Sequence, residues 1–492
     1  MARDCDQIIR KLPNYKEIVH LPEYVSTVAL LEKGIGIHHS GMLPILREIV
    51  EIMISKKYVF LLFATESFAI GLNCPIRSAV FTSLTKYDGN KMRFLHPHEY
   101  NQAASRCGRR GIDTIGHVIH CNNMFELPDE TDYKNILCGS PQTLVSKFRI
   151  SFQMILNMMQ NRLCNYETFY KFVAKSMMNN ELNAAIDREH MYLTTCKNEF
   201  EVKYANISNI SSELCEHVLS LKSLIKISAN KKRKKHDKEL KEYYLNHTDL
   251  DDQLNVYNEF KESEKKYKDQ ENYYLHLTDY ICSNVKNTIQ LLMDGKFITM
   301  NSDENYEFTN KGTIASHISE IHSLIITDTL VSTDFFRDFT PEQIVCVLSC
   351  FIDIKVPDDY KIHSFPINDY TMISCINNIN ASAEKYASME KRFDIFSGIN
   401  YDDMISYNIA SSITNWCSCA SEFDCKLLIE TQLYERDISI GEFTKAIMKV
   451  SAIVNELINM CESTNNIELL HKLSGIDNMI LKFITINQSL YV

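Results

Sequence analysis

The run Tyr58-Val59-Phe60-Leu61-Leu62-Phe63 decides the fold class of the first part of this chain. An unbroken apolar run of this length is typical of a strand buried on both faces. Upstream, Pro44 to Lys57 has apolar residues at helical spacing and begins with a proline suited to the first turn. Downstream, Ala79-Val80-Phe81 and His117-Val118-Ile119 are further strand runs, and 97–107 has a helical pattern. Alternating strands and helices predict an α/β domain with a mainly parallel sheet.

Glycine and proline mark a change of architecture near residue 141. Nine of the 14 glycines and seven of the 10 prolines fall at or before Pro141, whereas 142–294 contains neither. Because turns and hairpins need these residues, strands and loops are expected before this point and helices after it. One helical apolar stripe is expected to be buried, and it consists of Leu144, Val145, Phe148, Phe152, Ile155, Leu156 and Met159.

The later part of the chain reads as helices interrupted by one hairpin. Residues 183–282 are strongly charged with sparse apolar positions, which favours a long helical stalk. Phe297 to Met300 and Tyr306 to Thr309 flank a polar turn and predict a β-hairpin. Thr340-Pro341-Glu342-Gln343 is a capping box that opens a helix, and helices continue to Val492.

Composition excludes several classes of protein. The chain of 492 residues has 16 cysteines but no Cys-x-x-Cys pair, which argues against a zinc site or a disulfide framework. No signal peptide or membrane-length apolar run is visible, so we expect an intracellular protein that is not secreted. The net charge of −11 is unusual for a nucleic-acid-binding protein, although a local positive channel can operate inside an acidic chain.

Two segments have the chemistry to face phosphates. Ser105-Arg106-Cys107-Gly108-Arg109-Arg110-Gly111 follows a predicted helix, and arginines from one domain can stabilise a phosphoryl group held by another. Ala64 to Pro75 follows the predicted strand directly, where α/β folds usually contact ligands. Taken alone, a basic cluster such as the first segment is more often a solvated surface turn, and the second segment can be a simple exit from a strand. The paired His38 and His39 are expected to be structural rather than ligands.

Taken together, these strings resemble a known family. The order and spacing of Gly34 to Pro44, Ala64 to Pro75, Val80 to Ser83, Glu99 to Gln102 and Arg106 to Asp113 are similar to the second RecA-like domain of the superkiller and exosome-cofactor DExH-box RNA helicases. The resemblance continues through Phe148-Arg149, Phe339 to Gln343, Leu348 to Phe351 and the ending Ser489-Leu490-Tyr491-Val492.

The resemblance implies a domain organisation. It assigns 1–131 to a second RecA-like domain whose first strand is missing, and 132–182 with 283–322 to a winged helix. It assigns 183–282 to a helical stalk, which is a reduced arch without the family's β-rich head, and 323–492 to a C-terminal helical bundle.

The resemblance also implies site residues and ligands. Arg106 and Arg109 are the catalytic arginines of the sixth helicase motif, and Gln102, Gly71 and Asn73 lie on the nucleotide side. Thr65 of the fifth motif and Lys449 of the helix that walks along RNA are the RNA-binding residues. ATP and Mg²⁺ are the implied cofactors, and single-stranded RNA, an N-terminal helicase half and the RNA-decay machinery are the implied partners. No metal site is expected within this chain itself.

The chain departs from the family in ways that leave two functions open. It contains no Gly-x-x-x-x-Gly-Lys-Ser/Thr loop, and Asp129-Glu130-Thr131-Asp132 occurs in the wrong context to be an acidic metal-binding box. Lys449 and Ala452 stand where the family has an arginine and a glutamate. Retention of the sixth motif favours a module of an ATP-dependent 3′-to-5′ RNA helicase that is inactive alone. The replacements favour a non-catalytic, helicase-derived protein that binds RNA or a partner.

Overall fold

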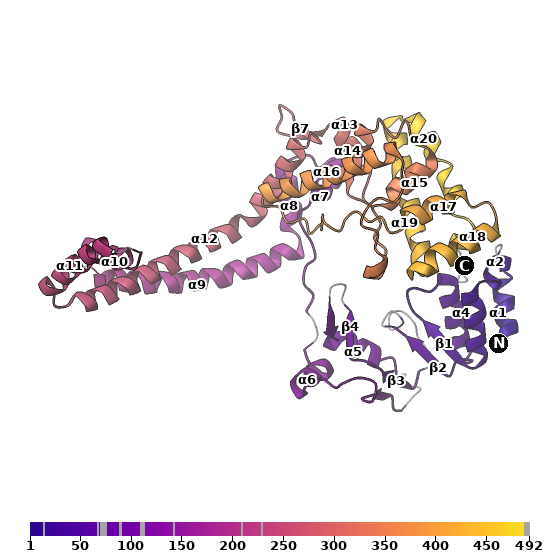
Figure 1. The fold of residues 1–492 in the computed structure, drawn as a ribbon, viewed down its shortest axis with the longest axis horizontal. Helices are drawn as coiled ribbons and strands as arrows, with labels where there is room; N and C mark the ends of the chain where they lie inside the picture. The colour runs from indigo at the N-terminus through magenta and orange to yellow at the C-terminus, as the bar shows by residue number, and fades with distance from the viewer. Residues whose placement is uncertain are drawn as a thin grey trace.

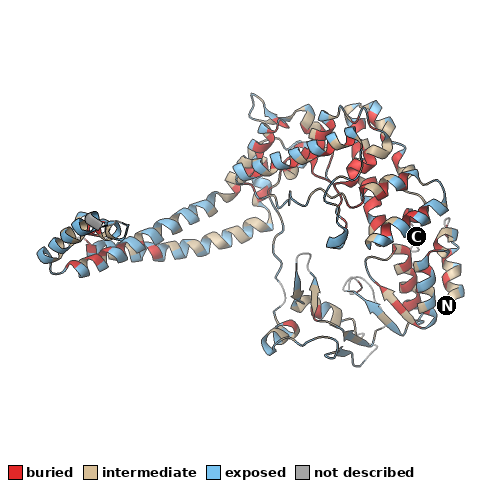
Figure 2. Ribbon diagram, viewed as in Figure 1, coloured by how far each residue is buried: buried red, intermediate tan, exposed pale blue. Residues whose placement is uncertain are grey.

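The computed structural model describes residues 1–12, 15–65, 68, 76–87, 91–108, 114–140, 143–207, 210–227 and 230–486. This part of the chain is mostly helical, and its strands form four two-stranded sheets (Figure 1). Buried residues concentrate in the C-terminal helices, whereas the long helical projection and the lobe that contains β3 are mostly exposed (Figure 2). The chain therefore combines one substantial core with several lightly packed parts.

The first lobe is a parallel strand pair covered by helices. β1 pairs in parallel with β2, in a register that sets Ile35 opposite Leu61 and His38 opposite Ala64. Pro44 occupies the first turn of α4, as its sequence predicts. The elements in chain order are α1 (Ala2–Ile9), α2 (Tyr15–Val19), α3 (Pro22–Glu32), β1 (Ile35–His38), α4 (Pro44–Ser55) and β2 (Leu61–Ala64).

The second lobe has its own small core. β3 pairs in parallel with β6, and β4 with β5 forms an antiparallel hairpin. Its buried apolar cluster consists of Leu84, Tyr100 and Ile136. Asp129 caps α6 by accepting a hydrogen bond from the backbone of Asp132, so the acidic string begins a helix. The elements are β3 (Ser78–Phe81), β4 (Thr85–Tyr87), β5 (Met92–Phe94), α5 (Pro97–Ala104), β6 (His117–His120) and α6 (Glu130–Cys138).

The expected burial of the run Tyr58 to Phe63 is wrong. The side chain of Phe60 is 90% exposed, and those of Leu61 and Phe63 are 49% and 55% exposed. The described strands form separate pairs instead of one sheet, and α3 and α4 pack on β1, so that Leu62 packs against the core while the other residues of β2 are exposed. An apolar run indicates that a strand is suited to burial, but burial also requires a neighbour on each side.

The predicted apolar stripe after residue 143 is only partly helical. α7 (Phe152–Gln160) begins where Ser151 caps the backbone of Met154. Phe152, Ile155, Leu156 and Met159 are buried as expected, but Leu144 and Val145 precede the helix and are 87% and 60% exposed. Ser151 caps the start of α7, so the helix begins later than the apolar periodicity suggested.

Two long antiparallel helices form the stalk. α9 (Met177–Ile207) and α12 (Leu250–Asp294) run side by side away from the rest of the chain, after α8 (Tyr166–Ala174) (Figure 1). At the far end, α10 (Ser212–Ile227) and α11 (Asn230–Asn246) pack on α12. Their separate apolar cluster includes Cys215, Val218, Leu254 and Tyr257. The described residues of this span contain no strand, but its end carries two helices that the sequence did not predict as separate elements.

The stalk end is expected to be dispensable for the stability of the rest. Residues 200–260 hold most of this separate cluster, and Glu199 and Lys266, 3.0 Å apart, mark where the two long helices remain paired. Replacing 200–260 by a short Gly-Ser turn should change the melting temperature of the main core by less than about 2 °C, because the removed contacts lie outside it. Thermal unfolding followed by circular dichroism measures this.

Leu457→Ala supplies the matched contrast, because Leu457 is fully buried in the main core. Such a substitution costs about 2–5 kcal/mol and should lower the melting temperature by several degrees. A sharp drop in the shortened chain would instead show that the stalk end supports the core.

The predicted hairpin and capping box are both confirmed. β7 (Ile298–Met300) pairs antiparallel with β8 (Tyr306–Phe308), and Thr340 and Gln343 cap each other at the start of α15. The remaining helices are α13 (Asn310–Ser316), α14 (Ser323–Ser332), α15 (Pro341–Ser349), α16 (Tyr370–Arg392), α17 (Ala410–Ser418), α18 (Glu422–Leu428), α19 (Ile440–Thr464), α20 (Ile467–Leu473) and α21 (Ile476–Ile480).

One apolar core joins the two ends of the chain. It contains buried residues of α1, α3 and α4 together with those of α14 to α21. Figure 1 shows the first lobe lying beside α18. The first lobe is therefore anchored on the C-terminal helices, whereas the second lobe relies on its own small cluster.

Candidate functional site

The helix α5, which carries Gln102 and leads into Arg106, is fixed at its start by ion pairs. Glu99 accepts two hydrogen bonds from Arg93, at 2.8 and 2.9 Å, and lies 3.0 Å from Lys86. Its carboxylate also accepts from the backbone of His96, which completes a capping box. Hydrogen bonding to Arg93 holds the pKa of Glu99 well below its ordinary value. These contacts attach α5 to the β4–β5 hairpin.

The inner face of α5 is fixed by aromatic residues. Tyr100 stacks on Phe81 with ring centroids 5.0 Å apart, and its hydroxyl lies 3.2 Å from Nε2 of His120. The other ring nitrogen of His120 lies 2.6 Å from the hydroxyl of Tyr133. Burial lowers the pKa of His120, so a neutral ring is favoured. With this face packed inward, Gln102 lies exposed on the outer face.

Arg106 lies in a tight turn that ends α5. Its side chain is partly buried, and the next residue, Cys107, forms a parallel β-bridge with Ile76. The backbone N–H of Gly108 donates to the carbonyl of Ile76 at 3.1 Å. Gly108 has a φ of +81°, and a Cβ there would lie 3.0 Å from Cα of Gly116, so both conformation and space require glycine. The turn is thus tied to the segment that follows Ala64 to Pro75.

Thr65 lies at the carboxyl end of β2 and is exposed. Its backbone N–H donates to the carbonyl of His38 at 3.2 Å, and its carbonyl accepts from Phe68 at 3.1 Å. His38 is 4% exposed, lies 2.9 Å from the Glu51 carboxylate and packs edge-on to Phe68. His38 is therefore enclosed by residues of the first lobe.

Three of the predicted site residues lie outside the described residues, namely Gly71, Asn73 and Arg109. Of the others, Arg106 and Gln102 share the end of α5, and Thr65 ends β2 in the first lobe. Lys449 lies on α19, a separate element in the helical bundle, where its side chain is exposed and Ala452 is partly buried.

The sequence interpretation missed further residues on α19. Lys445 donates to the backbone carbonyl of Ser40 at 2.8 Å, and Glu456 accepts from the backbone of Ser319 at 2.9 Å and of Glu320 at 3.0 Å. With Lys449, these side chains recur at helical spacing along one side of the helix. The spacing of these residues is visible in the sequence and could have identified them. The residues that they contact cannot be read from the sequence.

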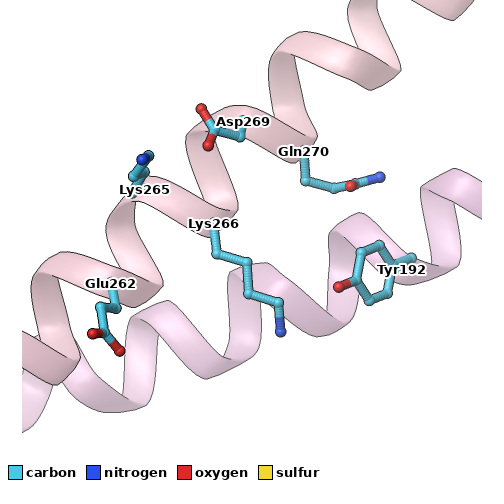
Figure 3. Close-up of a pocket in the computed structure, with 6 residues that line it drawn as sticks. All are labelled: Tyr192, Glu262, Lys265, Lys266, Asp269 and Gln270. Atoms are coloured by element: carbon cyan, nitrogen blue, oxygen red, sulfur yellow. The ribbon is translucent and has the colours of Figure 1, made fainter.

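A hollow on the stalk lies apart from the predicted site residues that the structure describes. It is lined by Tyr192, Glu262, Lys265, Lys266, Asp269 and Gln270. Figure 3 shows Lys266 and Gln270 extending from α12 toward α9, which carries Tyr192. Lys266 pairs with Glu199 at 3.0 Å, and Gln270 donates to Glu189 at 2.6 Å. These polar groups therefore serve to join the two stalk helices.

Two general searches of the described residues give no site. No group of three or more histidine, cysteine, aspartate or glutamate residues within them could hold a metal ion. Within the same ranges, no helix combines the length and the apolar character needed to cross a membrane.

Parts of the chain are similar in sequence to RNA helicases. Residues 305–487 match the family described as the DSHCT (NUC185) domain. The chain is 44% identical over 157 residues to the antiviral helicase SKI2 of Saccharomyces cerevisiae, which is 32% of this chain and 12% of the relative. It is 47% identical over 141 residues to superkiller complex protein 2 of Homo sapiens, which covers 28% of this chain and 11% of that protein.

A third relative is the exosome RNA helicase MTR4 of Mus musculus, which is 42% identical over 157 residues. That match covers 31% of this chain and 15% of the relative. The matched regions are thus between 11% and 15% of the length of these three helicases.

Proposed function

Because the chain belongs to the superkiller and exosome-cofactor type of DExH-box RNA helicases and corresponds to a C-terminal portion of them, we propose that it supplies the arginine side of an ATP site and part of an RNA path. Residues 1–131 would act as the second RecA-like domain. ATP and Mg²⁺ would be held mainly by an N-terminal half, and the assembled enzyme would move along single-stranded RNA in the 3′-to-5′ direction.

The observation that carries the proposal is the bond between Ile76 and the turn after Arg106. The bridge from Ile76 to Cys107 and the hydrogen bond from Gly108 join the residue after the proposed fifth motif to the turn of the proposed sixth motif. This link supports the proposal that both motifs belong to one phosphate-facing site. Arginine can stabilise charge on a transferring phosphoryl group when a second domain holds the nucleotide.

The hairpin supports assignment of 132–182 and 283–322 to a winged helix. The backbone N–H of Tyr306 in β8 donates to the carbonyl of Cys164 at 2.7 Å, which joins the hairpin to the segment between α7 and α8. Phe169 stacks on Tyr306 with centroids 5.9 Å apart. A hairpin packed on a small group of helices is the arrangement that a winged helix requires.

Lys449 is the residue of this portion best placed to contact RNA backbone. It is exposed on a helix whose opposite side is buried, and it carries a point charge that suits phosphate. Lys449→Ala should reduce the salt dependence of single-stranded RNA binding, with the slope of log K against log salt falling by about 0.7. Fluorescence anisotropy with an oligo-uridine across several salt concentrations measures this slope.

Lys197→Ala is the matched control, because Lys197 is an exposed lysine on the stalk helix α9. It should leave the slope unchanged. Equal slopes for the Lys449 and Lys197 variants would remove Lys449 from the RNA path. The second candidate function is a non-catalytic protein that binds RNA or a partner. Lys449 and Ala452 favour it, because both depart from the family pattern. Retained RNA binding without ATP turnover in any assembled form would favour it further.

A further inference from the structure

The loop after β1 lies directly against the first turn of α19. A Cβ built on Gly441 would collide with the carbonyl oxygen of Gly41 and lie 2.8 Å from that of Met42. These are backbone atoms, which cannot move aside as a flexible side chain can. Gly441 therefore permits an approach between two backbones that lie 400 positions apart in the sequence.

Two further contacts hold the same junction. Lys445, one helical turn after Gly441, donates to the carbonyl of Ser40 at 2.8 Å. Just before α19, Tyr434 donates to the carboxylate of Glu23 in α3. The first lobe and the start of α19 are thus joined by backbone contact, a charged hydrogen bond and a tyrosine–carboxylate bond.

The helix α19 is itself firmly held beyond this junction. Phe443 packs edge-on to Trp416 with centroids 5.5 Å apart, and Ser451 donates to Asp477 at 2.7 Å. Further along, Glu456 accepts from the backbone of Ser319 at 2.9 Å. These contacts tie α19 along its length to α17, to α21 and to the segment between α13 and α14. Lys449 lies eight residues after Gly441, which is about 12 Å along the axis.

We propose that the contact between Gly41 and Gly441 couples the first lobe to α19, so that the position of the lobe and the binding of RNA beside Lys449 depend on each other. Gly441 and Lys445 are positioning residues in this coupling. The role assigned to Lys449 rests on the proposed function, whereas the contact between the two glycines does not. Since coupling is reciprocal, RNA bound at α19 should stabilise the loop after β1.

Hydrogen exchange in the full chain tests the coupling. Mass spectrometry would follow the backbone amides of 39–43 in the wild type, Gly441→Ala, Lys445→Ala and Gly475→Ala. Gly475 is the matched control, because a Cβ there meets nothing within 4 Å. Gly441→Ala should speed exchange of the loop about tenfold, Lys445→Ala should do so by a smaller factor without adding volume, and Gly475→Ala should leave it unchanged. Unchanged exchange in both junction variants would overturn the coupling.

Adding an oligo-uridine separates this inference from the proposed function. In the wild type, RNA should slow exchange at 39–43, and Gly441→Ala should lose that protection while its affinity for RNA stays within about twofold. Binding of RNA without any protection of the loop would overturn the coupling and leave the proposed RNA contact standing. Failure of RNA to bind at all would overturn the proposed function. The exchange rates of the variants without RNA would still show whether the contact between Gly41 and Gly441 holds the loop.

Discussion

Replacing Arg106 or Arg109 by alanine is expected to abolish ATP turnover once this chain is combined with an ATP-binding helicase half. Phosphoryl transfer spreads negative charge over the transferring group, and an arginine that meets it can be worth about 10³ to 10⁵ in rate. Arg106 is held in place by the capped helix α5 and by the turn that Gly108 closes on Ile76. Steady-state turnover at saturating RNA measures the loss directly.

Binding of RNA should remain nearly intact in both variants, because the proposed RNA contacts lie on other elements. Arg106→Lys keeps the charge but loses the planar, two-pronged donor, so it should recover only part of the rate. Arg10→Ala is a suitable control, since Arg10 pairs with Asp6 on the exposed side of α1. A loss below tenfold in both alanine variants would count against the assignment of the sixth motif.

Local features of the fold could be predicted because their causes are local. Thr340 and Gln343 cap α15 through bonds within four residues, and Pro44 begins α4 because its fixed backbone suits a first helical turn. The hairpin of β7 and β8 follows from apolar runs around a polar turn. The helix before Arg106 also has a local cause, so the helix predicted from the sequence is present in the structure as α5.

Features that depend on distant partners could not be predicted. The run Tyr58 to Phe63 has the composition of a buried strand, yet Phe60 is exposed because no described element covers it. Leu144 has the apolar spacing of a helix but lies before the cap at Ser151, where α7 begins. The contact between Gly41 and Gly441 leaves no trace in either local sequence, since a glycine required by a distant backbone is indistinguishable from one required by a turn.

The chain alone is expected to have no detectable ATPase or unwinding activity. It contains no Gly-x-x-x-x-Gly-Lys-Ser/Thr loop to hold the phosphates, and arginines without a bound nucleotide stabilise nothing. The chain alone should also aggregate readily, because Leu61 and Phe63 are exposed on β2, as is Phe60 just before it, and β2 is available for strand pairing. Turnover of radiolabelled ATP and light scattering of the purified chain measure the two expectations.

Addition of an ATP-binding half that supplies the phosphate loop and a metal-binding acidic box should change both results. Contact with that half would cover exposed apolar side chains of β2 and lower the light scattering, and nucleotide held opposite Arg106 would allow RNA-stimulated turnover. Solubility and activity should then appear together at the same ratio of the two halves. ATP hydrolysis by the 492-residue chain alone, abolished by Arg109→Ala, would contradict this account, because it would require a complete nucleotide site within this sequence.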